Sequence, residues 1–157
     1  MLSAARNAAT WRPDWLWALP LIVATVVIHV LGLGFLHERV VVVVGRVVAR
    51  RHFTSRFAVV MGITVVLVAI LHSIEAWVWA CAYWLLGALP DLASSVLFSY
   101  GAMTTYGGSG LDLQRHWRLM GALEALNGII LFGLTTAFLF WMIQQVWMAE
   151  DERRHRH

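Results

Sequence analysis

Polar residues that could do chemistry interrupt the apolar stretches of this 157-residue chain at two places. His72 and Glu75 stand three positions apart, and so do Glu124 and Asn127. Residues at this spacing share one face of a helix, so His72 and Glu75 predict a buried ion pair, with a pH-sensitive switch as the alternative. A metal site needs more ligands than this pair supplies, and we therefore predict no bound metal there.

Glu124 is an acidic residue inside a long apolar run. A charged side chain at the centre of a membrane span costs roughly 2.5–3.5 kcal/mol on insertion scales, and such residues are candidates for function. We expect Glu124 and Asn127 to support a neighbouring loop from behind, with Glu124 hydrogen-bonded to Ser99 or Thr104. Direct binding of an ion by Glu124 is the alternative.

A glycine-rich loop is the third candidate site. Residues 99–110 read SYGAMTTYGGSG, so two threonines run directly into a cluster of glycines. The carbonyl groups of an extended loop can replace the hydration shell of a cation, and glycine permits the backbone angles that aim them at one axis. A helix that ends just before the loop adds the partial negative charge of its C-terminus. The loop therefore predicts a cation pathway, although Thr104 and Thr105 would also serve as simple helix caps.

Catalytic chemistry has little support in the sequence. Ser95 and Ser99 have no evident histidine and aspartate partners for a serine hydrolase. The glycine cluster is followed by Leu111, whereas a phosphate-binding loop needs Lys and then Ser or Thr. We expect neither an enzyme nor a cofactor.

Composition places these residues in a membrane. Hydrophobic residues make up 60% of the chain and charged residues only 13%, about half the proportion usual in soluble domains. All 12 basic residues are Arg. They flank apolar runs, which favours a role in membrane topology over nucleic-acid binding. The single cysteine, Cys81, excludes an internal disulfide framework.

The apolar segments predict an all-α membrane protein with three transmembrane helices. After a tail at 1–14, a first span covers 15–36, which is long enough to cross about 30 Å of hydrocarbon. An Arg-rich segment at 37–56 is expected at the cytoplasmic surface as an amphipathic helix. A β-prone loop is the alternative there because the segment contains a run of valines.

Residues 57–148 form the second predicted unit, followed by a charged tail at 149–157. Its outer helix ends near an expected aromatic belt, formed by Trp77, Trp79, Tyr83 and Trp84. A short helix at 91–103, capped by Asp91, precedes the loop at 104–110, and an inner helix covers 118–148. Because the short helix cannot cross a bilayer, it is expected to be re-entrant. The Arg distribution then predicts the N-terminus outside and the C-terminus in the cytoplasm.

This order of elements resembles the tetrameric potassium-channel pore-domain family. FSYGAMTTYGGSG resembles the pore helix and selectivity filter of that family, and WRLMGALEALNGIILFGLTTAFLF resembles the inner helix of its small bacterial members. The resemblance covers roughly residues 60–148. It implies a homotetramer in the lipid bilayer of a bacterial plasma (inner) membrane, conducting a monovalent cation, K+ or Na+, passively. Since one chain cannot enclose a pore, closed rotational symmetry would supply the ring.

The resemblance also assigns roles to individual residues. The filter would comprise Thr104, Thr105, Tyr106, Gly107, Gly108, Ser109 and Gly110, with Asp112 at the outer mouth. The cavity or gate would be lined by Ile129, Phe132, Gly133, Thr136 and Phe140. Packing against neighbouring helices is the alternative for these inner-helix residues, and Gly128 and Gly133 are candidates either for a hinge or for close helix packing.

The filter departs from the family pattern, which usually ends TTVGYGD or TTLGYGD. Aligned without a gap, Gly108 replaces the bracing tyrosine and Ser109 the second glycine, whereas a one-residue gap would match Gly110 to that glycine. The ungapped alignment predicts that Gly107→Ala damages the loop more than Gly110→Ala.

Because the filter departs from the family pattern, the resemblance does not imply selectivity for potassium. A non-conducting pore-like scaffold or regulatory protein is an alternative function, as is a proton-linked transporter built on the pair at 72 and 75.

Overall fold

The computed structural model describes residues 12–48, 53–107 and 110–155, which form helices joined by short connections and contain no strand. The helices are α2 (Arg12–Val48), α3 (Phe53–Leu85), α4 (Leu92–Met103) and α5 (Arg118–His155). Three of them contain a stretch long and apolar enough to cross a membrane: Asp14–Val40, Phe57–Leu85 and Arg118–Gln145. The prediction of an all-helical chain with three candidate membrane spans is therefore confirmed.

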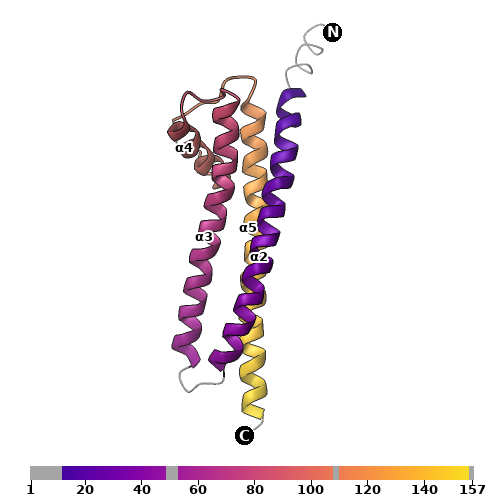
Figure 1. Cartoon of the computed structure of the whole chain (residues 1–157), viewed down its shortest axis with the longest axis vertical. Helices are drawn as coiled ribbons and strands as arrows, with labels where there is room; N and C mark the ends of the chain where they lie inside the picture. The colour runs from indigo at the N-terminus through magenta and orange to yellow at the C-terminus, as the bar shows by residue number, and fades with distance from the viewer. Residues whose placement is uncertain (1–11, 49–52, 108–109, 156–157) are drawn as a thin grey trace.

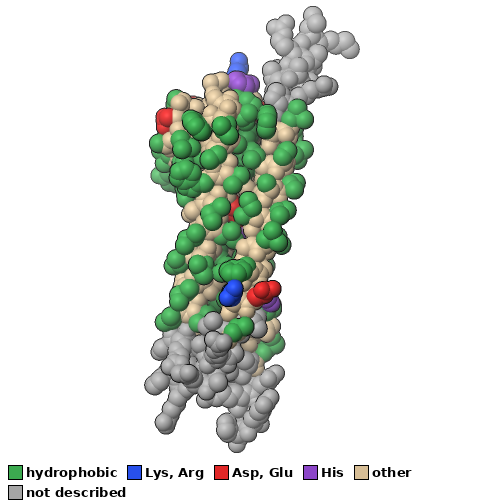
Figure 2. All heavy atoms as spheres, in the orientation of Figure 1, with side chains coloured by type: hydrophobic (Ala, Val, Ile, Leu, Met, Phe, Trp, Pro, Cys, Tyr) green, Lys and Arg blue, Asp and Glu red, His purple; other side chains and the backbone are tan. Residues whose placement is uncertain are grey.

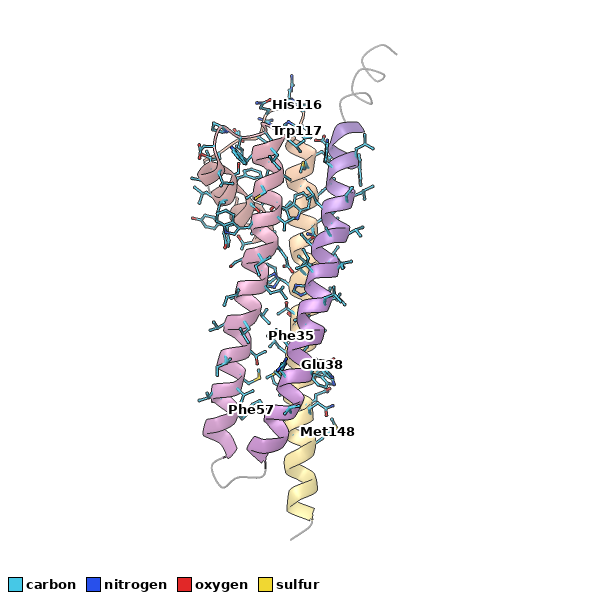
Figure 3. The ribbon with its side chains drawn as sticks, viewed as in Figure 1. Phe35, Glu38, Phe57, His116, Trp117 and Met148 are labelled. Atoms are coloured by element: carbon cyan, nitrogen blue, oxygen red, sulfur yellow. The ribbon has the colours of Figure 1, made fainter. Side chains whose placement is uncertain are left out.

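The three long helices lie side by side, and α4 is set beside one end of α3 and α5 (Figure 1). Figure 3 places His116 and Trp117 at the end where α4 lies, and Glu38, Phe57 and Met148 toward the opposite end. Hydrophobic side chains cover most of the visible length of the bundle (Figure 2). Such a surface suits contact with lipid, because water would penalise this much exposed apolar area.

The bounds of α2 differ from the expected ones. The helix continues through residue 37 to Val48, so the expected break after residue 36 is absent, and residues 37–48 are neither a separate segment nor a loop. Leu33, Leu36 and Val40 are buried, and the first two pack with Val68 and Leu71 of α3. This packing outweighs the few tenths of a kcal/mol by which each valine disfavours a helix. Residues 49–52 of the expected Arg-rich segment lie outside the described residues.

α5 also runs further than expected, to His155, so residues 149–155 continue the inner helix instead of starting a separate tail. The expected aromatic belt is wrong for two of its four residues. Trp77 and Trp84 are about half exposed, but Trp79 and Tyr83 are completely buried. These two rings belong to the hydrophobic core at the α4 end of the bundle, because the helix turns them toward α4 and α5 and away from lipid.

α4 begins and ends close to where the sequence places it. Asp91 has an extended backbone, and its carboxylate accepts hydrogen bonds of 2.8 Å from the backbone N–H and from the hydroxyl of Ser94. This confirms the predicted N-cap. The 12 residues of α4 rise only about 18 Å, which is too little to cross a bilayer.

Candidate functional site

The loop after α4 starts with a tight turn at the helix end. The Thr104 hydroxyl donates to the carbonyl of Tyr100 at 2.6 Å, so this threonine caps its own helix. Thr105 has a left-handed backbone with φ of 57°. The N–H of Gly107 donates back to the carbonyl of Gly101 at 3.2 Å. The first half of the loop therefore folds over the end of α4, and Tyr106 projects outward with 79% of its surface exposed.

Two glycines of the loop have backbones that require glycine. Gly107 and Gly110 have φ of 61° and 64°, in the region that L side chains rarely adopt. At both positions no described atom lies within 4 Å of where a Cβ would be. The backbone therefore gives no reason for Gly107→Ala to be worse than Gly110→Ala, and it favours neither alignment of the filter. Gly108 and Ser109 lie outside the described residues.

Asp112, expected at an outer mouth, lies close to this loop. It lines a cavity of about 390 Å³ together with Gly107, Gly101 and Arg118. The Asp112 side chain is exposed. The cavity thus brings one carboxylate and one guanidinium next to the loop backbone.

Glu124 lies behind the short helix, as predicted, and joins three helices. Its Oε1 contacts the hydroxyl of Ser99 in α4, and its Oε2 accepts a 2.8 Å hydrogen bond from the hydroxyl of Tyr83 in α3. Both Glu124 and Ser99 are completely buried. The expected bond to Ser99 is confirmed, whereas Thr104 bonds its own helix instead.

The hydrogens around Glu124 can be counted. Ser99 Oγ lies 2.7 Å from the carbonyl oxygen of Ala76 as well as against Glu124. A hydroxyl has one hydrogen and a carbonyl oxygen can only accept. The contacts are all satisfied when Ser99 donates to Ala76, Tyr83 donates to Glu124, and a protonated Glu124 donates to Ser99. A neutral acid at this position also avoids the cost of a buried charge.

Glycines let α4 approach α5 closely. A Cβ at Gly128 would lie 2.2 Å from the carbonyl oxygen of Met103, the last residue of α4, and one at Gly121 would lie 3.0 Å from Phe98. Gly128 therefore serves close helix packing. Gly133, by contrast, has no described atom within 4 Å of its missing Cβ, so among the described residues it serves no close packing of this kind. Gly121, seven residues before Gly128, has no role in the expectations above, and its spacing from Gly128 is the signal that could have revealed it.

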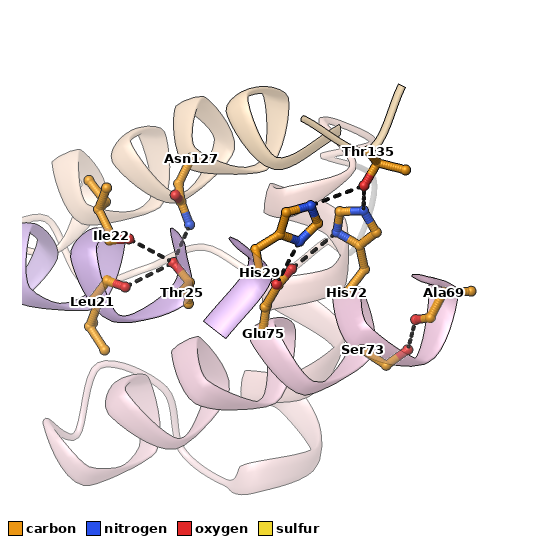
Figure 4. A network of polar contacts seen from close by, with 10 residues as sticks. All are labelled: Leu21, Ile22, Thr25, His29, Ala69, His72, Ser73, Glu75, Asn127 and Thr135. Carbon is orange, nitrogen blue, oxygen red and sulfur yellow. Dashed lines mark hydrogen bonds and ion pairs between the residues drawn. The ribbon is translucent and has the colours of Figure 1, made fainter. Parts of the chain in front are cut away.

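Asn127 does not support the loop as predicted. Its Nδ2 donates to Thr25 Oγ1 of α2 at 2.8 Å, so it joins α5 to the first helix. The two residues point in different directions around the axis of α5. Asn127 lies on the side that faces α2, whereas Glu124 faces α3 and α4. The Thr25 hydroxyl in turn lies within hydrogen-bond distance of the carbonyls of Leu21 and Ile22 (Figure 4).

The predicted pair of His72 and Glu75 is part of a larger buried cluster (Figure 4). His72 Nδ1 lies 3.2 Å from Glu75 Oε2, and His29 Nδ1 from α2 lies 2.8 Å from Glu75 Oε1. The other ring nitrogens of both histidines lie near the Thr135 hydroxyl of α5, at 3.0 Å from His72 and 3.1 Å from His29. The four residues thus connect all three long helices.

Sequence reasoning missed His29 and Thr135 as members of this cluster. The signal that could have found them is the rarity of polar residues in the spans. Thr25 and His29 lie four residues apart on α2, while Asn127 and Thr135 lie eight apart on α5, so each pair shares a helix face. Faces with such residues in a membrane are expected to meet, because each polar group needs a partner there.

The expected cavity face of α5 is largely exposed in the single chain. Ile129 is 58% exposed and Phe140 is 60% exposed, and Thr136 is also exposed and bonds only the carbonyl of Phe132 in its own helix among the described contacts. Phe132 differs from its neighbours because its ring stacks on His72 with 4.4 Å between centroids. It therefore covers the histidine cluster in this chain.

Comparison with known proteins identifies no relative. No protein-family model matches the chain, and neither a curated protein nor a solved structure matches it.

Proposed function

We propose that this protein is a passive cation channel of four identical chains, with the loops at 104–110 arranged around one shared axis. The observation that carries this proposal is the way in which α4 is held in place by the long helices. A helix too short to span is fixed between two long helices by buried hydrogen bonds of Ser99 and by the contact at Gly128. Its C-terminus leads into a loop rich in threonine and glycine. The order of these elements is the one expected from the sequence resemblance to the potassium-channel pore-domain family.

Exposed surfaces support the assembly of several copies. The loop residues Thr104 to Gly107 and the α5 residues Ile129, Thr136 and Phe140 are exposed in one chain. In a tetramer the α5 faces would line a central cavity, where Phe140 would narrow the path and Thr136 would offer a hydroxyl. A hydrophobic constriction of this kind can gate by losing its water.

The permeant ion is a monovalent cation, K+ or Na+. Carbonyl oxygens of residues 104–110 would replace its water shell, and Asp112 at the mouth would attract it. The loop lacks the tyrosine and second glycine of the usual filter, so we expect weaker discrimination between these ions. The channel would lie in a bacterial plasma membrane with its C-terminus in the cytoplasm, the side favoured for Arg.

A non-conducting scaffold is the second candidate, and one observation favours it. The first half of the loop folds back on α4, with Thr105 in the left-handed region and Gly107 bonded to Gly101. A row of carbonyls aimed at an ion needs an extended backbone instead. If this fold persists in the assembly, the loop would close the path.

Flux and subunit count test the proposal together. The purified full chain is reconstituted in liposomes, and K+, Na+ and a divalent cation are compared over a range of voltage and pH, while native mass spectrometry counts the chains. We expect a tetramer that passes monovalent cations, with flux reduced at least tenfold in Gly107→Ala. Gly62→Ala is the matched control, because Gly62 lies in α3 with no described atom within 4 Å of its missing Cβ. A monomer, or absence of flux under every condition, would overturn the channel, and pH-coupled uptake lost in Glu75→Gln would point to a transporter.

A further inference from the structure

The buried cluster of His29, His72, Glu75 and Thr135 has the ligand chemistry of a metal site. One ligand atom from each of His29, His72 and Glu75 lies within 4.8 Å of the other two, and all three residues are buried. Two imidazole nitrogens with one carboxylate oxygen form a recurrent zinc-binding set that leaves a fourth position open. His72 and Glu75 alone supply too few ligands for a metal, and the structure adds His29 of α2 as the third.

Thr135 orients both rings toward the same point. Its Oγ1 lies 3.0 Å from Nε2 of His72 and 3.1 Å from Nε2 of His29. Histidine ligands typically bond through their second ring nitrogen to an oxygen, which fixes the ring and frees the other nitrogen for the metal. The Nδ1 atoms, on the opposite edges of the rings, lie 2.8 Å and 3.2 Å from the carboxylate of Glu75 (Figure 4).

Two atoms at this point make no hydrogen bond among the described residues. They are His72 Nδ1 and Glu75 Oε2, both buried. These atoms lie 3.2 Å apart, within ion-pair distance of each other (Figure 4), but they do not form a hydrogen bond, so a hydrogen on Nδ1 would not point at the carboxylate. Buried polar atoms without a hydrogen bond are rare and call for an explanation such as an ion. A cation bound between His29, His72 and Glu75 would contact both of these atoms. A proton on His72 Nδ1 would not, because the N–H bond is poorly aligned with the carboxylate oxygen.

We propose that His29, His72 and Glu75 bind one divalent transition-metal ion of the zinc class. Imidazole nitrogens select zinc, nickel or iron over magnesium and calcium, which prefer sites made of oxygen. A cavity of about 380 Å³ lies against one side of the cluster and is lined by His72, Thr135 and Phe132. The same cavity is lined by Thr104, the first residue of the glycine-rich loop.

The bound ion would fasten α2 to α3 through metal–ligand bonds. His29 comes from α2, while His72 and Glu75 come from α3. The metal site is separate from the ion path, and metal binding does not depend on ion conduction. A chain that binds the metal without conducting ions would support it and still contradict the proposed channel.

Metal binding is tested on the purified full chain in detergent. The protein is stripped with a chelator and titrated with Co2+, whose absorption reports tetrahedral coordination, and bound Zn2+ is counted by mass spectrometry. Every variant is made in a background in which His52, His155 and His157 are replaced by Ala, because histidines outside the cluster bind metals weakly. We expect one ion per chain, lost in His29→Ala and in Glu75→Gln. His116→Ala is the control and keeps the ion, because His116 lies at the end of the bundle (Figure 3).

Two further measurements separate binding from misfolding. Zn2+ should raise the melting temperature of the parent chain and leave that of Glu75→Gln unchanged, because only a folded site gains from the ligand. Thr135→Val keeps the three ligands and should weaken metal affinity by roughly 10–100-fold, as loss of a supporting hydrogen bond typically does. Equal binding by the parent and Glu75→Gln would show adventitious metal only, and no binding by the parent would show that the cluster holds protons alone. Either result would overturn the proposal.

Discussion

Glu75 and Tyr106 lie in opposite kinds of surroundings. Glu75 is completely buried and faces histidines from α2 and from its own helix. Tyr106 is 79% exposed, and the described hydrogen bonds of its loop neighbours Thr104, Thr105 and Gly107 go only to α4. One chain therefore assembles the histidine cluster from all three long helices, whereas the described hydrogen bonds tie the loop to α4 alone and leave Tyr106 open to other surroundings. In the proposed channel those surroundings are other copies of the chain.

The same contrast divides the two sides of α5. Glu124, Asn127, Gly128 and Thr135 face inward and each contacts another helix. Ile129, Thr136 and Phe140 are exposed. Substitutions on the inward side should act on the stability of one chain, and those on the exposed side on assembly or conduction. Matched pairs of similar residues on the two sides can test this division.

The two glycines of α5 give the largest expected difference. Gly128→Ala would place a Cβ 2.2 Å from the carbonyl of Met103, so α4 must move away. Overpacking of this kind costs about 1–3 kcal/mol, and we expect the upper end because the obstacle is backbone. Gly133→Ala meets no described atom and should be neutral or stabilise the helix by up to roughly 1 kcal/mol. Thermal unfolding in detergent measures both, and equal melting temperatures would contradict the division.

Glu124 offers the second test, through the hydrogen it is inferred to carry. Glu124→Gln keeps an acceptor for Tyr83 and a donor for Ser99, so stability should change little. Glu124→Ala removes the acceptor of the Tyr83 hydroxyl and the donor to Ser99, and the buried Tyr83 hydroxyl is left without an acceptor, at a cost of about 1–3 kcal/mol. Denaturant titration of both variants checks this order. If Gln proved as damaging as Ala, Glu124 would have to act as a carboxylate.

The sequence predicted those parts of the fold that depend on local chemistry. Asp91 followed by Ser94 indicates a cap, and α4 starts one residue after Asp91. An acid placed one to two turns into an apolar helix needs hydrogen-bond partners nearby, which led to the predicted contact with Ser99. Span positions follow from length and hydrophobicity alone, and all three were found.

Contacts between the long helices could not be predicted in the same way. α2 and α3 are apolar on all sides, so their hydrophobic pattern does not reveal which face turns inward. The partner of Asn127 and the membership of His29 in the cluster depend on that rotation. The valine run at 40–44 is compatible with a helix or a strand by local preference, and the structure shows that it continues α2.

Two adjacent threonines of α5 provide a smaller and sharper comparison. Thr135 lies against both histidines, whereas Thr136 bonds the carbonyl of Phe132 in its own helix. Replacing Thr135 with Val keeps its shape but removes the partner of two ring nitrogens, and in metal-free protein we expect a loss of about 1 kcal/mol. Thr136→Val should leave stability unchanged. In the flux assay we expect the opposite order, with the larger change in ion flux for Thr136→Val, because only Thr136 lies on the exposed face of α5. A larger change in flux for Thr135→Val would argue against that face as the lining of the cavity.

Asp91 is expected to show the smallest effect, confined to acidic pH. Hydrogen bonds from the backbone N–H and hydroxyl of Ser94 hold the pKa of the Asp91 carboxyl below its ordinary value of 3.8. A depressed pKa means that the cap stabilises the folded protein fully above about pH 4 and loses this contribution as the pH falls through the folded pKa. Asn is a comparable N-cap and does not titrate. Hydrogen exchange of the Ser94 amide should therefore match in the parent and Asp91→Asn at neutral pH, and rise in the parent alone, relative to the variant, below pH 4. If acid affects both chains equally, the carboxylate does not hold the start of α4, and other contacts of the helix must do so.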